Sequence, residues 1–236
     1  MPAGDLPGWH EVFADDFTVA VPTGRFPSAV ATRWKAYQDG WTDTSDNGTY
    51  MPSKVLSQHD GVLDYFVHTE NGVHMVAAPL PIVPGAPGPE GGLVAGRYSV
   101  RFRADVLPGY KTAWLLWPDS ERWPADGEID FPEARLDGND TITGFMHRQD
   151  GGGQDAYDSG VVEAGTGWHT ATIEWKPNWC RFVLDGRVLG TSTAHVPNTP
   201  MHLVLQTETY TSGPAPSSSV AGHVLVDWIT VHVPAG

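Results

Sequence analysis

The sequence predicts an all-β protein, a sandwich of two antiparallel sheets, and three observations point to it. Apolar and polar residues alternate with a period of two along most of the chain, whereas the period of an α-helix is nearly absent. Glycine (27 residues) and proline (20 residues) are abundant. Together with Asn and Asp they interrupt the apolar runs about every ten residues, as short antiparallel strands require.

Length and composition predict the domain organisation. The 236 residues are 40% hydrophobic, which is enough for one sizeable core. The Pro- and Gly-rich run Leu80–Gly92 is too short for an interdomain linker and is typical of a surface loop. We therefore expect a single domain over residues 1–236.

The clearest strand lies in the middle of the chain, at Arg97–Asp105. Its apolar residues alternate with polar ones, which predicts one buried and one polar face; the apolar residues are Tyr98, Val100, Phe102 and Ala104. Thr170–Lys176 repeats this pattern with Ala171, Ile173 and Trp175 on one face. We expect both segments to cover the same core.

The C-terminal half continues with a hairpin and a long final strand. The dipeptide Asp185-Gly186 between two apolar runs predicts a tight β-turn. The only cysteine, Cys180, precedes this turn in an apolar strand pattern, so we expect a packed side chain and not a nucleophile. The run His223–Val233 is apolar on both faces except at Asp227, which is typical of a central strand.

Charge and aromatic content narrow the class of ligand. The formal charge of −14 repels phosphate backbones and anionic lipids, so we expect neither nucleic-acid nor membrane partners. An uncharged ligand is not repelled, although acidity that serves solubility alone explains the number equally well. The ten tryptophans suit flat ligand faces as well as a core. We assign Trp175 and Trp228 to the core because they lie in strongly apolar strands.

The segment Trp123–Glu133 (WPADGEIDFPE) carries the chemistry. Side chains alternate along a strand, so Glu128 and Asp130 share one face while the apolar residues between them point into the core. Glu133, five positions after Glu128, would point inward on a regular strand, where an unpaired carboxylate is very costly. One extra residue in a β-bulge at Phe131-Pro132 restores its phase, and bulges and prolines often occur together.

Three neighbouring acids predict paired-carboxyl chemistry. Their repulsion favours one retained proton near neutral pH, which gives one ionised group and one protonated group, as glycoside hydrolysis requires. A retaining mechanism needs about 5–5.5 Å between the two carboxyl groups, so the bulge must bring them together. An acidic surface strand and a cation site are the alternatives. A cation site is the weaker one, because hard cations favour flexible loops with backbone oxygens.

These residues resemble glycoside hydrolase family 16, whose bulge-type active-site strand has the pattern Glu128-Ile129-Asp130-x-x-Glu133 after Gly127. The resemblance covers about the whole chain, through the GYKTAWLLWP, GRYSVR and WHTATIEW segments and the final Asp227-Trp228. It implies a concanavalin-like jelly-roll sandwich with a carbohydrate cleft on the concave sheet. It also implies that Glu128 is the nucleophile, Glu133 the general acid/base and Asp130 a hydrogen-bond partner of Glu128.

The resemblance also suggests substrate-binding residues. His147 occupies the place of a histidine that approaches the acid/base; a surface-strand histidine is an equal alternative. Trp114 and Trp123 are the candidates for sugar-stacking walls, and Trp117 could replace either. Gln206 and Glu208 match cleft-lining polar positions, or form a surface pair. The family often carries a structural calcium, for which Asp227 is the matching ligand; no cofactor is required.

The implied function is retaining endo-hydrolysis of β-1,3- or mixed β-1,3/1,4-glucan. Another polysaccharide such as a galactan, transglycosylation, and a non-catalytic lectin are the alternatives. The loops that set the substrate, Tyr37–Tyr50, Leu80–Gly92, Gln149–Gly160 and Thr207–Ser219, do not match a laminarinase pattern. We expect a monomer that acts outside the cell, although the first residues have no basic start or apolar core of a signal peptide.

Overall fold

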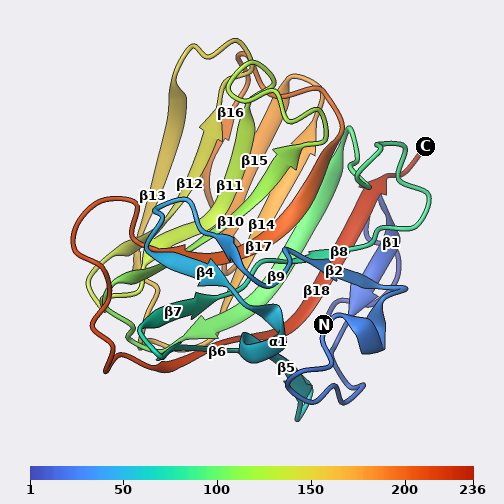
Figure 1. Cartoon of the computed structure of the whole chain (residues 1–236). Helices are drawn as coiled ribbons and strands as arrows, with labels where there is room; N and C mark the ends of the chain where they lie inside the picture. Colours follow the sequence, from blue (N-terminus) through green and yellow to red (C-terminus); the bar gives the residue numbers. More distant parts are fainter.

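The computed structural model describes all 236 residues. Its two main sheets pack face to face as a jelly-roll sandwich (Figure 1). The smaller sheet has five strands, in the order β13 (Gln154–Val162), β12 (Thr141–His147), β11 (Glu128–Arg135), β10 (Tyr110–Pro118) and β17 (Met201–Thr209).

The larger sheet covers the other side of the core and has eleven strands. Nine follow one another in the order β16 (Arg187–Ser192), β15 (Trp179–Leu184), β14 (His169–Lys176), β9 (Gly96–Ala104), β18 (Gly222–Pro234), β6 (Val62–Glu70), β7 (Val73–Val76), β4 (Gly48–Tyr50) and β3 (Trp41–Thr42). In addition, β1 (Trp9–Asp15) pairs with β18, and β5 (Leu56–His59) pairs with β6.

Helices and a small third sheet complete the structure. The third sheet joins β2 (Trp34–Ala36) and β8 (Pro79–Pro81), so the predicted loop Leu80–Gly92 begins in a short strand. The helices are a 3-10 turn at Ser28–Val30 and α1 at Pro52–Val55. Neither has the length and apolar character needed to cross a membrane.

The core lies between the two main sheets. Phe102 on β9 meets Trp114 on β10 edge to face, with ring centroids 5.0 Å apart, and Phe182 on β15 meets Phe131 on β11 at 5.4 Å. Burial of such aromatic side chains contributes about 1.5–3 kcal/mol each. The predicted core residues Trp175 and Trp228 are both buried.

The predicted strands are confirmed. All four alternating apolar residues of β9 are buried, and the run around Asp185-Gly186 is a hairpin whose two turn residues have φ of 50° and 80°. Strand β18 pairs with β9 on one side and with β6 and β1 on the other, so it is a central strand, as its sequence predicts. Cys180 is fully buried on β15.

Candidate active site

The bulge predicted in β11 is present. Asp130 pairs with Leu115 on β10 and with Phe145 on β12, whereas Glu133 pairs with Ala113 and Thr143. Thus β11 advances by three residues, from Asp130 to Glu133, where each neighbouring strand advances by two. The additional residue lets Glu133 share the cleft-facing side of the strand with Glu128 and Asp130, and Phe131 stays buried in the core.

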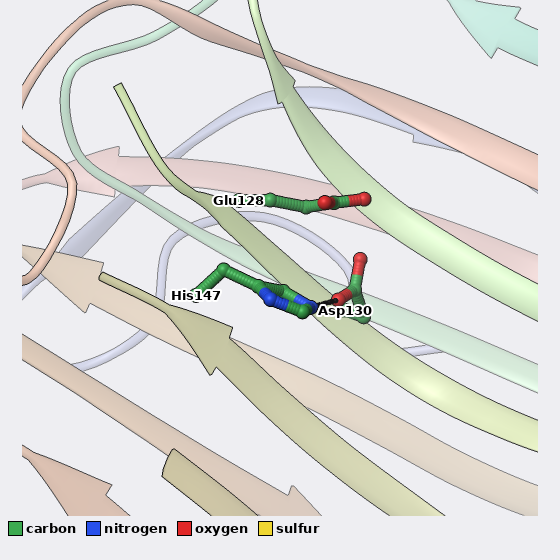
Figure 2. A group of neighbouring side chains, drawn as sticks. All are labelled: Glu128, Asp130 and His147. Atoms are coloured by element: carbon green, nitrogen blue, oxygen red, sulfur yellow. Dashed lines mark ion pairs between the residues drawn. The ribbon is translucent and has the colours of Figure 1, made fainter. Parts of the chain in front are cut away.

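Glu128, Asp130 and His147 form a compact group (Figure 2). One carboxylate oxygen of each acid and one imidazole nitrogen lie within 4.8 Å of one another, and Nε2 of His147 is 2.9 Å from Oδ2 of Asp130. The register between β11 and β12 places His147 directly opposite Glu128. The expectation that His147 approaches the acid/base Glu133 is therefore corrected: the His147 imidazole contacts Asp130, because the strand pairing places His147 at the Glu128 end of the catalytic segment.

Electrostatics in this group favour a shared proton. Burial, followed by the nearby charge of Asp130, raises the pKa of Glu128 to about 9. Burial, followed by the charge of Glu133, also raises the pKa of Asp130 well above its usual range. Ionising both carboxyl groups at this short distance would cost much free energy, because their negative charges repel each other. The pair therefore keeps one proton at neutral pH. This agrees with the retained proton expected from the sequence.

Lys111 on β10 was not predicted from the sequence. Its Nζ lies 2.8 Å from Oε1 of Glu133 and 3.3 Å from Oε1 of Glu208. Burial alone would lower the pKa of Lys111, but the two carboxylates outweigh it and raise that pKa. A signal was available, because Lys111 is the one charged residue in the otherwise uncharged segment GYKTAWLLWP.

The three acids lie in a cleft of about 530 Å³. Trp117, Trp123, His147, Gln206 and Glu208 also line it, as the resemblance suggested for each. Two indole side chains differ sharply in accessibility, since Trp123 is 51% exposed and Trp114 is fully buried.

The assignment of Trp114 to the cleft is wrong. Along β10 the side chains alternate, and Lys111, Ala113, Leu115 and Trp117 point into the cleft. Trp114 has the opposite phase, so it points between the sheets and packs on Phe102.

The N-terminal segment supplies cleft residues that were not individually predicted: Tyr37, Trp41, Thr42, Asp43, Thr44 and Tyr50. Their segment is fixed by Asp43, which accepts hydrogen bonds from the backbone N of Gly48 (3.0 Å) and from the backbone N and Oγ1 of Thr209 (2.8 and 2.6 Å). Thr209 ends β17, so Asp43 joins this wall of the cleft to the catalytic sheet.

A second cavity of about 460 Å³ adjoins the cleft. The two share Tyr37, Trp41 and Glu121 in their linings. At the second cavity, His202 is buried on β17 and its Nδ1 lies 2.7 Å from Oδ1 of Asp119. The indole of Trp41 is 50% exposed between the two spaces.

The surroundings of Asp227 do not fit the suggested calcium site. Asp227 forms an ion pair with Arg101, and it belongs to no cluster of three or more acidic, histidine or cysteine side chains. A guanidinium in contact with the carboxylate already supplies the positive charge that calcium would bring.

Paired carboxyl groups in the cleft of a jelly-roll sandwich are the arrangement that a carbohydrate-cleaving enzyme uses. The model of the family "Glycosyl hydrolases family 16" matches residues 92–230. The chain therefore belongs to glycoside hydrolase family 16 and is a glycoside hydrolase with a polysaccharide substrate.

Solved structures show the same fold. The laminarinase from Rhodothermus marinus superposes with a TM-score of 0.76 at 20% identity, over 97% of this chain and 98% of that one. SCLam, a non-specific endo-β-1,3(4)-glucanase of the family, has a TM-score of 0.76 at 17% identity, over 100% and 95%.

A partial sequence match links the chain to a much larger protein. The clotting factor G alpha subunit of Tachypleus tridentatus is 26% identical over 88 residues, which are 34% of this chain and 13% of that subunit. The match thus spans a small part of that protein.

Proposed function

We propose that this enzyme hydrolyses internal bonds of β-1,3- or mixed β-1,3/1,4-glucan with retention of the anomeric configuration. The observation that carries the proposal is the bulged strand β11, which presents Glu128 and Glu133 in one cleft with Asp130 between them. Solved relatives of the same fold include a laminarinase and an endo-β-1,3(4)-glucanase, which supports glucan as the substrate.

In the first step Glu128 attacks the anomeric carbon while Glu133 gives its proton to the departing glycosidic oxygen. The Glu128 ester then breaks when a water molecule attacks the same carbon and gives its proton to Glu133. For this sequence Glu128 must be ionised before the attack. We assign the shared proton to Asp130, which is the more buried of the two acids and therefore favours the neutral form. When Asp130 is neutral, its charge no longer raises the pKa of Glu128, so Glu128 is the ionised member of the pair.

The charge of the cleft supports an uncharged substrate. Lys111 is the only lysine or arginine in the lining, against six carboxyl groups, those of Asp43, Glu121, Glu128, Asp130, Glu133 and Glu208. A sulfated or uronic polysaccharide would be repelled, whereas a neutral glucan is not.

The two adjoining cavities support action inside a polymer. A chain that passes the exposed Trp41 would contact both spaces, so binding extends beyond the sugars next to the cleaved bond. Because such a polymer is too large to enter a cell intact, we place the activity outside the cell.

The test is the release of reducing ends from a panel of polysaccharides, with laminarin, mixed-linked glucan and galactan as the main members. We expect Glu128→Gln to lower kcat on the preferred polymer by at least about 10³-fold while thermal unfolding is unchanged, since the nucleophile is lost. Proton NMR of the first product reports its anomeric configuration. Near-normal activity of Glu128→Gln, or an inverted product, would contradict the mechanism.

The same experiment separates the alternative functions. A lectin would bind laminarin without releasing reducing ends from the wild-type protein. A transglycosylase would give longer products when a short acceptor oligosaccharide is added.

A further inference from the structure

The ammonium group of Lys111 joins three neighbouring strands at the catalytic site. Lys111 lies on β10, between Glu133 on β11 and Glu208 on β17. The register pairs Lys111 directly with Glu208, and Glu133 lies opposite Ala113, two residues further along β10 on the same face. The pairing of three strands therefore fixes the place of this cation.

Burial makes these contacts strong. The side chains of Lys111 and Glu208 are 12% and 2% exposed, whereas that of Glu133 is 25% exposed. Charges held in a poorly solvated place interact far more strongly than at the surface. Lys111 donates a hydrogen bond to Oε1 of Glu133, so Oε2 of Glu133 remains available to a substrate.

We propose that Lys111 is a positioning residue for Glu133 in the glycosidase reaction. Held by Glu208, it fixes the Glu133 carboxyl group and stabilises the negative charge that Glu133 acquires when it gives up its proton. The inference rests on the proposed function, because it needs Glu133 as the general acid/base.

The proton balance gives Lys111 a role in one part of the reaction. When the glycosidic bond breaks, the proton moves from Glu133 to the leaving oxygen, and the new carboxylate forms beside the Lys111 ammonium. An ammonium already in place at that point stabilises the developing charge without reorganisation. Glu128 attacks the anomeric carbon in the same step, but Lys111 contacts neither Glu128 nor Asp130 within ion-pair distance, so it acts on the leaving-group side alone.

The other charged groups around Glu133 do not duplicate this role. Asp130 on β11, Glu208 on β17 and the buried Glu163 behind the sheet are all acids, and the residue opposite Glu133 on β12 is the uncharged Thr143. Lys111 is thus the only cation in contact with the acid/base.

The test compares two substrates that differ in their need for an acid. A natural glucan bond needs a proton on its leaving oxygen. In a dinitrophenyl β-glycoside of the same sugars, the leaving group is dinitrophenolate, which departs without a proton because it is a weak base. We expect Lys111→Met, which keeps the apolar stem, to lower kcat/KM on laminarin by about 10–100-fold. On the dinitrophenyl glycoside the loss should be less than about threefold, because acid assistance is not needed there.

Matched variants separate positioning from folding. Lys111→Arg keeps the charge and should recover part of the laminarin activity, and Glu133→Gln should show the same substrate dependence as Lys111→Met. Since Lys111→Met leaves Glu208 without its cation, the double variant Lys111→Met/Glu208→Gln removes that buried charge and should fold with a Tm near that of the wild type.

Two results would overturn the inference. Equal losses of Lys111→Met on both substrates would mean a structural role, and unchanged activity on laminarin would mean no role. Failure of the proposed function looks different, because the wild-type enzyme would then cleave neither substrate. If another polymer of the panel is preferred, that polymer and its dinitrophenyl glycoside replace the glucan pair.

Discussion

At the scale of single residues, environment assigns different tasks to the same carboxyl chemistry. Glu128 and Asp130 are close enough to share a proton, whereas Glu133 has Lys111 as its neighbour. Glu163 shows a third situation. It is fully buried and accepts a hydrogen bond from Oγ1 of Thr112 at 2.8 Å, while its Oε2 has no partner. Burial raises the pKa of Glu163 to about 8, so it holds its proton in the folded protein at neutral pH.

Glu163 should make the fold less stable as the pH rises from about 4.5 to about 8. In the unfolded chain the pKa returns toward its ordinary value of 4.5, so the folded state binds more protons between pH 4.5 and about 8. Stability contributed by this group therefore falls as pH rises through that window, by at most about 5 kcal/mol in the free energy of unfolding.

We expect Glu163→Gln to remove this dependence, because the amide is neutral at every pH. The Tm of the variant relative to the wild type should increase from pH 5 to pH 9, as measured by differential scanning calorimetry. A constant Tm difference across this range would contradict the assignment.

At the scale of elements, two irregular features position the site. The bulge in β11 brings Glu133 to the cleft face, and Asp43 holds the segment between β3 and β4 on the end of β17. Both features break a regular strand pattern. Only glycine fits at position 48 beside Asp43, because a Cβ at this position would lie 2.3 Å from Oδ2 of Asp43 and would clash with it. The wall that carries Trp41 thus depends on one buried carboxylate.

We expect Asp43→Ala to weaken both the fold and the activity. The substitution leaves the buried N–H groups of Gly48 and Thr209 without an acceptor, which costs about 2–4 kcal/mol. Urea unfolding should show a lower midpoint, and kcat/KM on the polymer should fall because Trp41 loses its support. The control is Asn47→Ala, an exposed change in the same segment that should leave both quantities near wild type. Equal effects of the two variants would contradict this role for Asp43.

At the scale of the whole molecule, a binding surface longer than one cavity results from combining separate parts of the chain. The five-stranded sheet supplies the acids, the N-terminal segment supplies Tyr37 and Trp41, and the segment around Glu90 contributes to the second cavity. Asp119 accepts hydrogen bonds from the backbone N of Glu90 and Gly92, which ties that segment to the end of β10. The length of the substrate that is recognised is therefore a property of the assembled sandwich.

Trp41 and Trp123 allow a matched test, because their exposed fractions are 50% and 51% but only Trp41 lines both cavities. We expect Trp41→Ala to reduce kcat/KM on long oligosaccharides about tenfold more than on short ones, since only long chains reach the second cavity. Trp123→Ala should reduce both by similar factors. The measurement is kcat/KM over a series of oligosaccharides of increasing length. A Trp41→Ala loss that does not depend on chain length would contradict an extended binding surface.

Local pattern by itself determined much of this protein. Period-two alternation located β9, β14 and β18, and Asp185-Gly186 located a hairpin, because strand and turn preferences are set by neighbouring residues. The bulge was predictable for a similar reason. A carboxylate in phase with Ile129 and Phe131 would be buried without a partner, so the strand must shift at that point.

Contacts between distant segments were decided only by the tertiary structure. Trp114 and Trp117 are both plausible sugar platforms in sequence, and the packing of the two sheets decided that Trp114 belongs to the core. The partner of His147 and the place of Lys111 between Glu133 and Glu208 depend on strand register, which one sequence does not reveal. The catalytic acids could be predicted from the sequence because they are neighbours on one strand. The groups that set the charge of these acids lie on other strands and contact them only in the folded protein.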